Sequence, residues 1–176
     1  MSEFRTRASS EKFHGRKIVV RVDEVQYPDG KLHEVEVVGH AGAVVIIAQP
    51  EPGQVVLVHQ YRHATGRSLW EIPAGTMEAG ENPATTAARE LAEETGYRAK
   101  RLRKVWTAYS APGFCEELLH FFIAEDLTPG ETSFDEGEDI ETRVFAVHEA
   151  WEMVKRNELP DAKTQIALAY LITRTD

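Results

Sequence analysis

Hydrophobic and polar positions alternate along residues 18–40, as they do in strands that expose one face. The run IVVRVDEVQY begins at Ile18 and the run LHEVEVVGH begins at Leu32, with PDGK at Pro28–Lys31 between them. Proline presets one dihedral of a tight turn and glycine tolerates a positive φ, so these residues predict a β-hairpin over 16–40. Residues 1–15 are polar and mixed in charge, and they are predicted to form a flexible arm.

A continuous apolar run, GAVVII over 42–47, follows this hairpin and predicts a strand that is buried on both faces. After a turn at Glu51–Gly53, the segment VVLVHQYR over 55–62 predicts the next strand. Further strands are predicted around 102–109, 118–124 and 142–147, and helices over 82–96, from near His148, and from Asp161 to about Thr173, with Ile166, Ala169, Tyr170 and Ile172 or Thr173 along one stripe of the last helix. Strands interspersed with helices predict an α/β chain whose mixed sheet is of the α+β type.

Composition narrows the class of protein. The 176 residues are 42% apolar and 28% charged, which suits one soluble domain with a proper core. A net charge of −9 argues against a nucleic-acid partner, but not against a small phosphorylated ligand whose charge metal ions can offset. The single cysteine, Cys115, excludes an internal disulfide. No apolar run approaches 18 residues and Met1–Gly15 has no signal-peptide pattern, so we expect a cytoplasmic protein without a membrane partner.

Acidic residues gather near the C-terminal end of the predicted helix 82–96, where a helix disfavours them. Glu90, Glu93 and Glu94 project within an arc of roughly 100°, at 100° per residue. Like charges one turn apart cost about 0.2–0.5 kcal/mol per pair, and acids at the negative end of the macrodipole cost about 0.3–1 kcal/mol more. Arg89 can pair with Glu93, four residues on, but the remaining charge calls for another cation. A solvated acidic face is the alternative; clustered carboxylates of this kind suit Mg²⁺ or Mn²⁺.

The wider spacing favours the metal interpretation. Gly75 is followed after five residues by Glu81, and after seven more by RELAEETGY over 89–97. This pattern resembles the Nudix box at each of its defining positions. The resemblance implies a Nudix fold, which is an α/β/α sandwich, over 41–176. It also implies hydrolysis of a nucleoside diphosphate linked to another group.

Other segments resemble the ADP-ribose pyrophosphatase branch of that family. Pro112 lies sixteen residues beyond Gly96, and the remaining matching pieces are QYR at 60–62, WEIPAG at 70–75, EE and His at 116, 117 and 120, and EGEDIE at 136–141. The resemblance implies metal-dependent hydrolysis of ADP-ribose to AMP and ribose 5-phosphate. It also implies a homodimer, with the hairpin 16–40 at the dimer interface. Another nucleotide sugar such as GDP-mannose, or a non-catalytic ADP-ribose-binding module, remains the alternative.

The same resemblance assigns roles to single residues. Metal ligands are expected from Glu90, Glu94, Glu93 and the carbonyl of Ala74, with Glu81 in the outer sphere and Arg89 orienting Glu93. Glu138 is the expected general base, with Glu136 and Glu141 as substitutes within the acidic loop. Thus Glu138, Glu93 and Arg89 form the expected catalytic set. Substrate binding is assigned to Arg62, as a bidentate phosphate ligand, and to Glu71, Pro112, Gly113 and Phe114.

Overall fold

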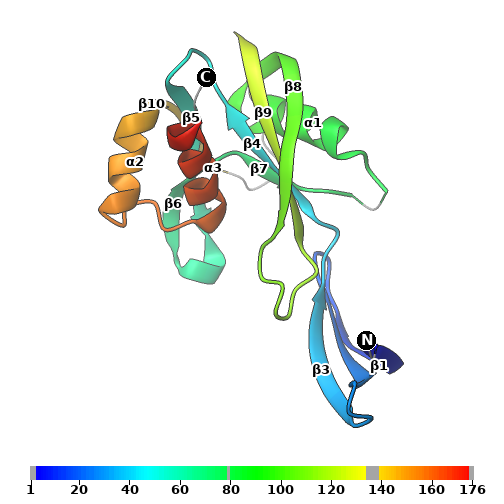
Figure 1. Ribbon diagram of the computed structural model, residues 1–176. Coiled ribbons are helices and arrows are strands. Elements are labelled where there is room, and N and C mark those ends of the chain that lie inside the picture. The colour runs from blue at the N-terminus through cyan, green and yellow to red at the C-terminus, as the bar shows by residue number, and fades with distance from the viewer. Residues whose placement is uncertain (1–2, 79, 134–138, 175–176) are drawn as a thin grey trace. The chain divides into compact units, whose positions relative to one another are not determined.

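The computed structural model describes residues 3–78, 80–133 and 139–174, so the predicted base Glu138 and its substitute Glu136 lie outside the described residues (Figure 1). The chain divides into two compact units. The N-terminal unit comprises Met1–Gly42 and Thr107–Leu119, and the main unit comprises Ala43–Trp106 and His120–Asp176.

The N-terminal unit contains an antiparallel sheet of the order β1-β2-β3, formed by β1 (Arg5–His14), β2 (Val19–Gln26) and β3 (Leu32–Gly39). The predicted turn joins β2 to β3, where the Tyr27 amide donates to the Lys31 carbonyl at 2.8 Å. Gly30 has φ of 85°, which explains the glycine at this position of the turn. The hairpin predicted over 16–40 is therefore confirmed.

The flexible arm predicted for residues 1–15 is wrong for the part that the structure describes. Arg5–His14 form β1 and pair with Gln26–Val19 of β2, so the hairpin is two strands of a three-stranded sheet. All ten residues of β1 are exposed, and the backbone ladder does not require an apolar side chain. Ser9 adds a side-chain bond by donating to the buried Asp23 at 2.6 Å. This strand lacks the apolar alternation from which strands are predicted.

The segment Thr107–Leu119 of the N-terminal unit pairs with β3. The Val38 amide donates to the Phe114 carbonyl at 2.7 Å, and the Glu116 amide donates to the Val38 carbonyl at 2.9 Å. Arg21 of β2 then binds both carboxylate oxygens of Glu116, at 3.0 and 2.6 Å. Backbone pairing and a bidentate ion pair together fix this segment against the sheet.

Among its described residues, the main unit contains two sheets and three α-helices. The four-stranded sheet has the order β7-β4-β9-β8 and the three-stranded sheet has the order β10-β5-β6. The elements are β4 (Ala43–Ala48), β5 (Gln54–Arg62), the 3-10 turn η1 (His63–Thr65), β6 (Arg67–Glu71), β7 (Ala74–Thr76), α1 (Pro83–Thr95), β8 (Tyr97–Tyr109), β9 (Leu118–Pro129), β10 (Ile140–Ala146), α2 (Val147–Lys155) and α3 (Ala162–Thr173).

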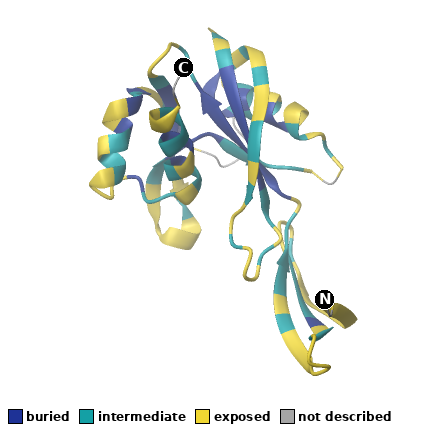
Figure 2. Cartoon of the chain, viewed as in Figure 1, coloured by how far each residue is buried: buried dark blue, intermediate teal, exposed yellow. Residues whose placement is uncertain are grey.

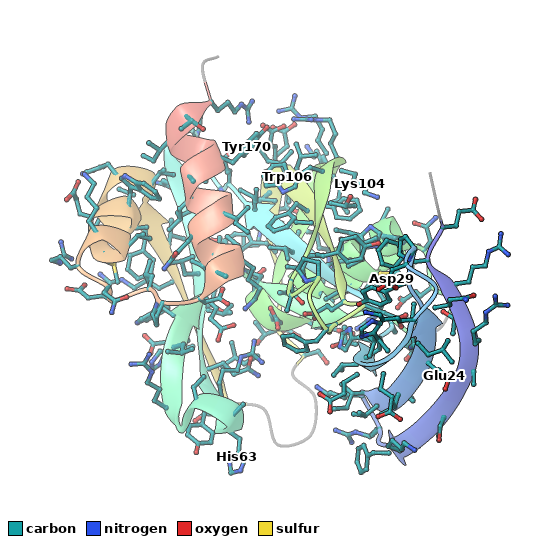
Figure 3. All side chains as sticks on the ribbon, turned by 60° about the horizontal axis from the view of Figure 1, so that its bottom comes forward. Glu24, Asp29, His63, Lys104, Trp106 and Tyr170 are labelled. Carbon is teal, nitrogen blue, oxygen red and sulfur yellow. The ribbon has the colours of Figure 1, made fainter. Side chains whose placement is uncertain are left out.

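The central strand β4 is buried along its whole length, as its apolar run predicts (Figure 2). Its alternate residues Val44, Ile46 and Ala48 join a core cluster with Ala87 and Leu91 of α1. Aromatic side chains connect the four-stranded sheet to α3 (Figure 3). There Trp106 of β8 stacks on Phe121 with ring centroids 4.7 Å apart, and it also contacts Tyr170 of α3 at 4.7 Å. Helices thus cover both faces of the sheet, which confirms the predicted sandwich.

The last helix buries a different stripe from the predicted one. Thr164, Ala167 and Leu168 are buried, whereas Ile166 and Ile172 are exposed. Because α3 carries apolar residues on nearly all sides, its periodicity does not identify the face that packs on the sheet. Within the described residues, no helix has the length and apolar character needed to cross a membrane.

Candidate active site

The helix α1 presents the acidic residues of the box. Asn82 caps it by accepting a hydrogen bond from the Ala84 amide at 2.9 Å, and Pro83 occupies its first turn. Gly96 ends it in the left-handed conformation, with φ of 72°, and donates to the Ala92 carbonyl at 3.0 Å. The predicted bounds of this helix are therefore confirmed, and Glu90, Glu93 and Glu94 lie in its last two turns.

Gly75 of β7 makes room for the side chain of Glu90. A Cβ atom built on Gly75 would lie 1.9 Å from Cδ and 2.1 Å from Oε1 of Glu90. Any side chain at residue 75 would therefore displace this carboxylate. The φ of Gly75 is not positive, so its backbone conformation does not require a glycine. The glycine is needed because the backbone approaches Glu90 closely.

Glu94 is fixed by hydrogen bonds from two other elements, one to its side chain and one to its backbone. Its side chain is buried, with 6% of the residue exposed, and its Oε2 accepts a hydrogen bond from the Ala74 amide at 3.2 Å. Its carbonyl accepts a hydrogen bond from Thr142 Oγ1 of β10 at 2.9 Å. The structure therefore brings Glu94 beside Ala74, as the predicted shared metal site requires.

Arg89 lies among the acids of the box. Its Nη1 is 2.9 Å from Oε1 of Glu90 and 2.8 Å from Oε2 of Glu93, and its Nη2 is 3.6 Å from Oε2 of Glu81. Partial burial disfavours the charged guanidinium, but Glu90 and Glu93 outweigh it and raise the pKa of Arg89. The predicted Arg89–Glu93 pair is confirmed. The Glu78 amide donates to Glu81 at 3.2 Å and lowers the pKa of that carboxyl, which holds Glu81 at the edge of the group.

The donors around α1 fit a hard divalent cation. Among the residues that the structure describes, no three His, Cys, Asp or Glu side chains form a metal-binding cluster. The chemistry of the donors is nevertheless uniform, because Glu81, Glu90, Glu93 and Glu94 offer only carboxylate oxygens. The space left by Gly75 accommodates one of these carboxylates directly beside the backbone of β7. A cation bound there would replace the contacts that Arg89 makes with Glu90 and Glu93.

Arg62 and the buried Glu71 form a partly exposed ion pair in the same unit. Arg62 donates from Nε and Nη2 to the two oxygens of Glu71, each at 2.9 Å, and Glu71 is 2% exposed. Lys163 also donates to Glu71 Oε2, at 2.5 Å, and to Asp161 at 2.9 Å. Burial opposes the charge of Glu71, but the two cations prevail and lower the pKa of its carboxyl. The hydrogen bond to Glu71 raises the pKa of Arg62.

Lys163 was not predicted as part of the site. It stands 92 residues beyond Glu71 in the sequence, and an isolated lysine in the first turn of a helix gives no local signal of such a partner. The sequence predicted only that the helix begins at Asp161, whose carboxylate caps it by accepting a hydrogen bond from the Thr164 amide at 2.9 Å.

The remaining predicted substrate residues belong to the N-terminal unit. Pro112, Gly113 and Phe114 follow Ala111, whose carbonyl accepts hydrogen bonds from the Phe114 amide at 3.1 Å and the Cys115 amide at 2.9 Å. The side chain of Phe114 is exposed. In the main unit Glu141 lies on β10, paired in register with His59 of β5. The roles expected for Pro112, Gly113, Phe114 and Glu141 stay predictions.

Comparisons with known proteins agree with the fold and the box. The model of the NUDIX domain matches residues 39–168. The ADP-ribose pyrophosphatase of Bacillus subtilis is 42% identical over 171 residues, covering 96% of this chain and 92% of that protein. The methanol dehydrogenase activator of Bacillus methanolicus is 37% identical with the same coverage. A crystal structure of an ADP compounds hydrolase superposes with a TM-score of 0.83 at 20% identity, covering 97% of this chain and 92% of that one. The domain match and the two relatives, together with the arrangement of Gly75, Glu90 and Glu94, lead to one conclusion: the chain belongs to the Nudix family.

Proposed function

We propose that this Nudix hydrolase cleaves the pyrophosphate linkage of ADP-ribose. The oxygen of a water molecule forms a bond to one phosphorus, the bond from that phosphorus to the bridging oxygen breaks, and AMP and ribose 5-phosphate result. The observation that carries the proposal is the approach of Glu90 to Gly75 and of Glu94 to the Ala74 amide, which gathers carboxylates from a helix beside a strand. The identity to the ADP-ribose pyrophosphatase of Bacillus subtilis supports this choice of substrate.

The proposed metal ligands are Glu90, Glu94, Glu93 and the carbonyl of Ala74. A divalent ion bound there, Mg²⁺ or Mn²⁺, would offset negative charge on the pyrophosphate oxygens and acidify water. Glu81 and Arg89 orient the acidic side chains through the contacts described above. Arg89 also neutralises part of the acidic group before an ion binds, which reduces the repulsion between Glu90 and Glu93.

Glu138 is the proposed general base that takes the proton of the attacking water. Described residues on both sides of it are tied to the C-terminal end of α1. The Ser133 amide donates to the Glu93 carbonyl at 3.1 Å, and Thr142 Oγ1 donates to the Glu94 carbonyl at 2.9 Å. These two bonds support a base supplied from the segment between Ser133 and Thr142. Glu141, on β10, and Glu136 are its substitutes.

Arg62 is the proposed phosphate ligand. The two bonds to Glu71 use its Nε and Nη2, so Nη1 is the nitrogen that would meet a phosphate oxygen. Its side chain is 37% exposed, which leaves the guanidinium accessible to a ligand. Glu71 is thereby assigned to hold Arg62, and Pro112, Gly113 and Phe114 to contact the nucleotide.

A substrate panel tests the proposal. Purified protein is assayed with Mg²⁺ on ADP-ribose, GDP-mannose and NADH, and the products AMP, GMP and sugar phosphate are separated by chromatography. We expect the highest kcat/KM for ADP-ribose. We also expect Glu94→Gln to lower that value by at least about 100-fold, because it removes a carboxylate that acts in the transition state. Preferred cleavage of GDP-mannose, or turnover by Glu94→Gln near that of the wild type, would overturn the proposal.

A further inference from the structure

The first turn of α3 holds the end of β6 through a group of charged side chains. Glu71, the last residue of β6, accepts hydrogen bonds from both Arg62 and Lys163. The side chain of Lys163 is 17% exposed and that of Glu71 is 2% exposed. Both ions are therefore largely removed from water, where an ion pair is screened less and the loss of one partner costs more than at a surface.

The two cations share one oxygen of Glu71. Oε2 accepts from Nη2 of Arg62 at 2.9 Å and from Nζ of Lys163 at 2.5 Å, while Oε1 accepts from Nε of Arg62 at 2.9 Å. If Arg62 were the partner that held Glu71 alone, the carboxylate and the guanidinium could rotate together without breaking their two hydrogen bonds. The bond from Lys163 removes that freedom, since Lys163 is itself anchored to Asp161 at 2.9 Å.

A second bond ties the same turn of α3 to the next residue of the strand. Thr164 Oγ1 accepts a hydrogen bond from the Ile72 amide at 2.8 Å, and Thr164 is fully buried. The segment Glu71–Ala74 is thus fixed at Glu71 and Ile72 by α3, and at Ala74 by Glu94 of α1. Arg62, through Glu71, and Glu94, through Ala74, are therefore bound to the same short segment of backbone. Glu94 also interacts electrostatically with Arg62.

From this geometry we infer that Lys163 is a positioning residue for substrate binding. By holding Glu71, it fixes the guanidinium of Arg62 in the orientation that presents Nη1 to the pyrophosphate of the substrate. The inference deepens the proposed function and rests on it. An arginine side chain loses rotamer entropy when it is immobilised, so a guanidinium that is already fixed binds a phosphate more tightly than a mobile one.

The test is a double-mutant cycle between Lys163 and Arg62. Lys163→Met, Arg62→Met and the double variant are compared for KM and kcat with ADP-ribose, and for the Kd of a nonhydrolysable ADP-ribose analogue by calorimetry. We expect Lys163→Met to raise KM and Kd about tenfold and to leave kcat within about twofold, because the effect acts through a ligand contact. We expect the double variant to be no weaker than Arg62→Met, because Lys163 acts only through Arg62.

Two further variants separate positioning from a general loss of structure. Lys163→Arg, which keeps a cation for Glu71, should restore Kd to within about threefold of the wild type. Lys155→Met is the matched control, since Lys155 pairs with Glu152 at 2.6 Å on an exposed part of α2 and should leave KM unchanged. Circular dichroism confirms that each variant is folded. If Lys163→Met does not fold, Lys163→Gln, which keeps a donor but no charge, takes its place in the cycle.

Additive effects of the two substitutions on Kd, a lowered kcat at unchanged KM, or wild-type values in the Lys163 variant would each overturn the inference. These results differ from a failure of the proposed function. In that case the wild-type protein itself would neither cleave ADP-ribose nor bind its analogue.

Discussion

Gly75 and Glu90 lie so close together that only a residue without a side chain leaves room for the carboxylate. The contact is local in space but not in sequence, because one residue belongs to β7 and the other to α1. Its effect is to hold an acidic side chain against the backbone instead of letting it extend into water. The position of Glu90 therefore depends on the pairing of Val44 with Gly75 in the sheet.

Gly75→Ala tests this contact. The added Cβ would lie 1.9 Å from Cδ of Glu90, so the carboxylate must move by more than an ångström. Displacement of that size commonly costs about 100-fold in rate, and we expect a loss of at least that order in kcat/KM for ADP-ribose. Steady-state kinetics give the result. Gly39→Ala is the control, because a Cβ there meets its nearest neighbour at 3.5 Å. Equal activity of the two variants would refute the steric explanation.

At the scale of elements, α1 has well-capped ends but carries acidic residues in its C-terminal turn, where the helix dipole disfavours them. Asn82, Pro83 and Gly96 supply the cap, the first turn and the left-handed end. They are local signals, so the helix could be predicted from the sequence together with its bounds. The cap at Asn82 stabilises α1 independently of the acidic side chains at its far end.

Asn82→Ala should lower the free energy of unfolding by about 1 kcal/mol, because the Ala84 amide loses its partner. Urea denaturation measures the change. Thr85→Ala is the matched control: this residue is exposed on the same helix, so its substitution should change stability by no more than about 0.5 kcal/mol. An equal loss in both variants would show that the cap contributes nothing specific.

The group that joins β6 to α3 has a dependence on pH that can be stated with its sign. The pKa of Glu71 is lowered below its ordinary value of 4.5 in the folded protein. Its charge therefore stabilises the fold fully above about pH 4.5, and this contribution is lost as the pH falls through the lowered value. We expect Glu71→Gln to be less stable than the wild type by about 1–3 kcal/mol at pH 7, with the difference shrinking below pH 4.5. Urea denaturation across pH 3–7 measures it; a difference independent of pH would contradict this account.

The sequence reveals elements better than the contacts between them. The buried strand β4 follows from its unbroken apolar run, and the turn at Pro28–Lys31 follows from its proline and glycine. The strand β1 could not be predicted, because backbone hydrogen bonds and the Ser9–Asp23 bond hold it without any apolar pattern. The bond between Lys163 and Glu71 could not be predicted either, since it depends on tertiary packing across 92 residues.

In the candidate site, too, contacts set by local sequence spacing could be predicted, whereas contacts between elements could not. The pairing of Arg89 with Glu93 follows from a spacing of four residues on a helix, and the structure confirms it. The approach of Gly75 to Glu90 became clear only with the strand register. For Arg62, the sequence suggested a phosphate ligand but did not reveal that Glu71 already occupies two of its nitrogens.

At the scale of the whole molecule, the N-terminal sheet leaves large apolar side chains in water. Phe4, Phe13 and Leu32 are each more than half exposed, and every residue of the edge strand β1 is exposed. Exposed apolar residues and an unpaired edge are typical of surfaces that associate with another chain. They support the proposal that the protein is a homodimer formed through this sheet.

Phe13→Lys tests that proposal. Sedimentation equilibrium of the wild type should give twice the mass of one chain, whereas the variant should dissociate at least about tenfold more readily because a charge replaces an apolar contact. Lys12→Ala, on the neighbouring exposed residue, should leave the mass of the wild type unchanged. A monomeric wild-type protein, or a variant that dimerises equally well, would contradict an interface on this sheet.

The most direct test of the whole account follows the products of ADP-ribose hydrolysis by the wild-type protein with Mg²⁺, with excess chelator, and after Mg²⁺ is restored. We expect equal amounts of AMP and ribose 5-phosphate with Mg²⁺, none above background with chelator, and full recovery when the ion returns. Absence of AMP in the presence of Mg²⁺ and Mn²⁺, or its undiminished formation with chelator, would contradict a hydrolase that depends on the carboxylates of α1 to bind a divalent ion.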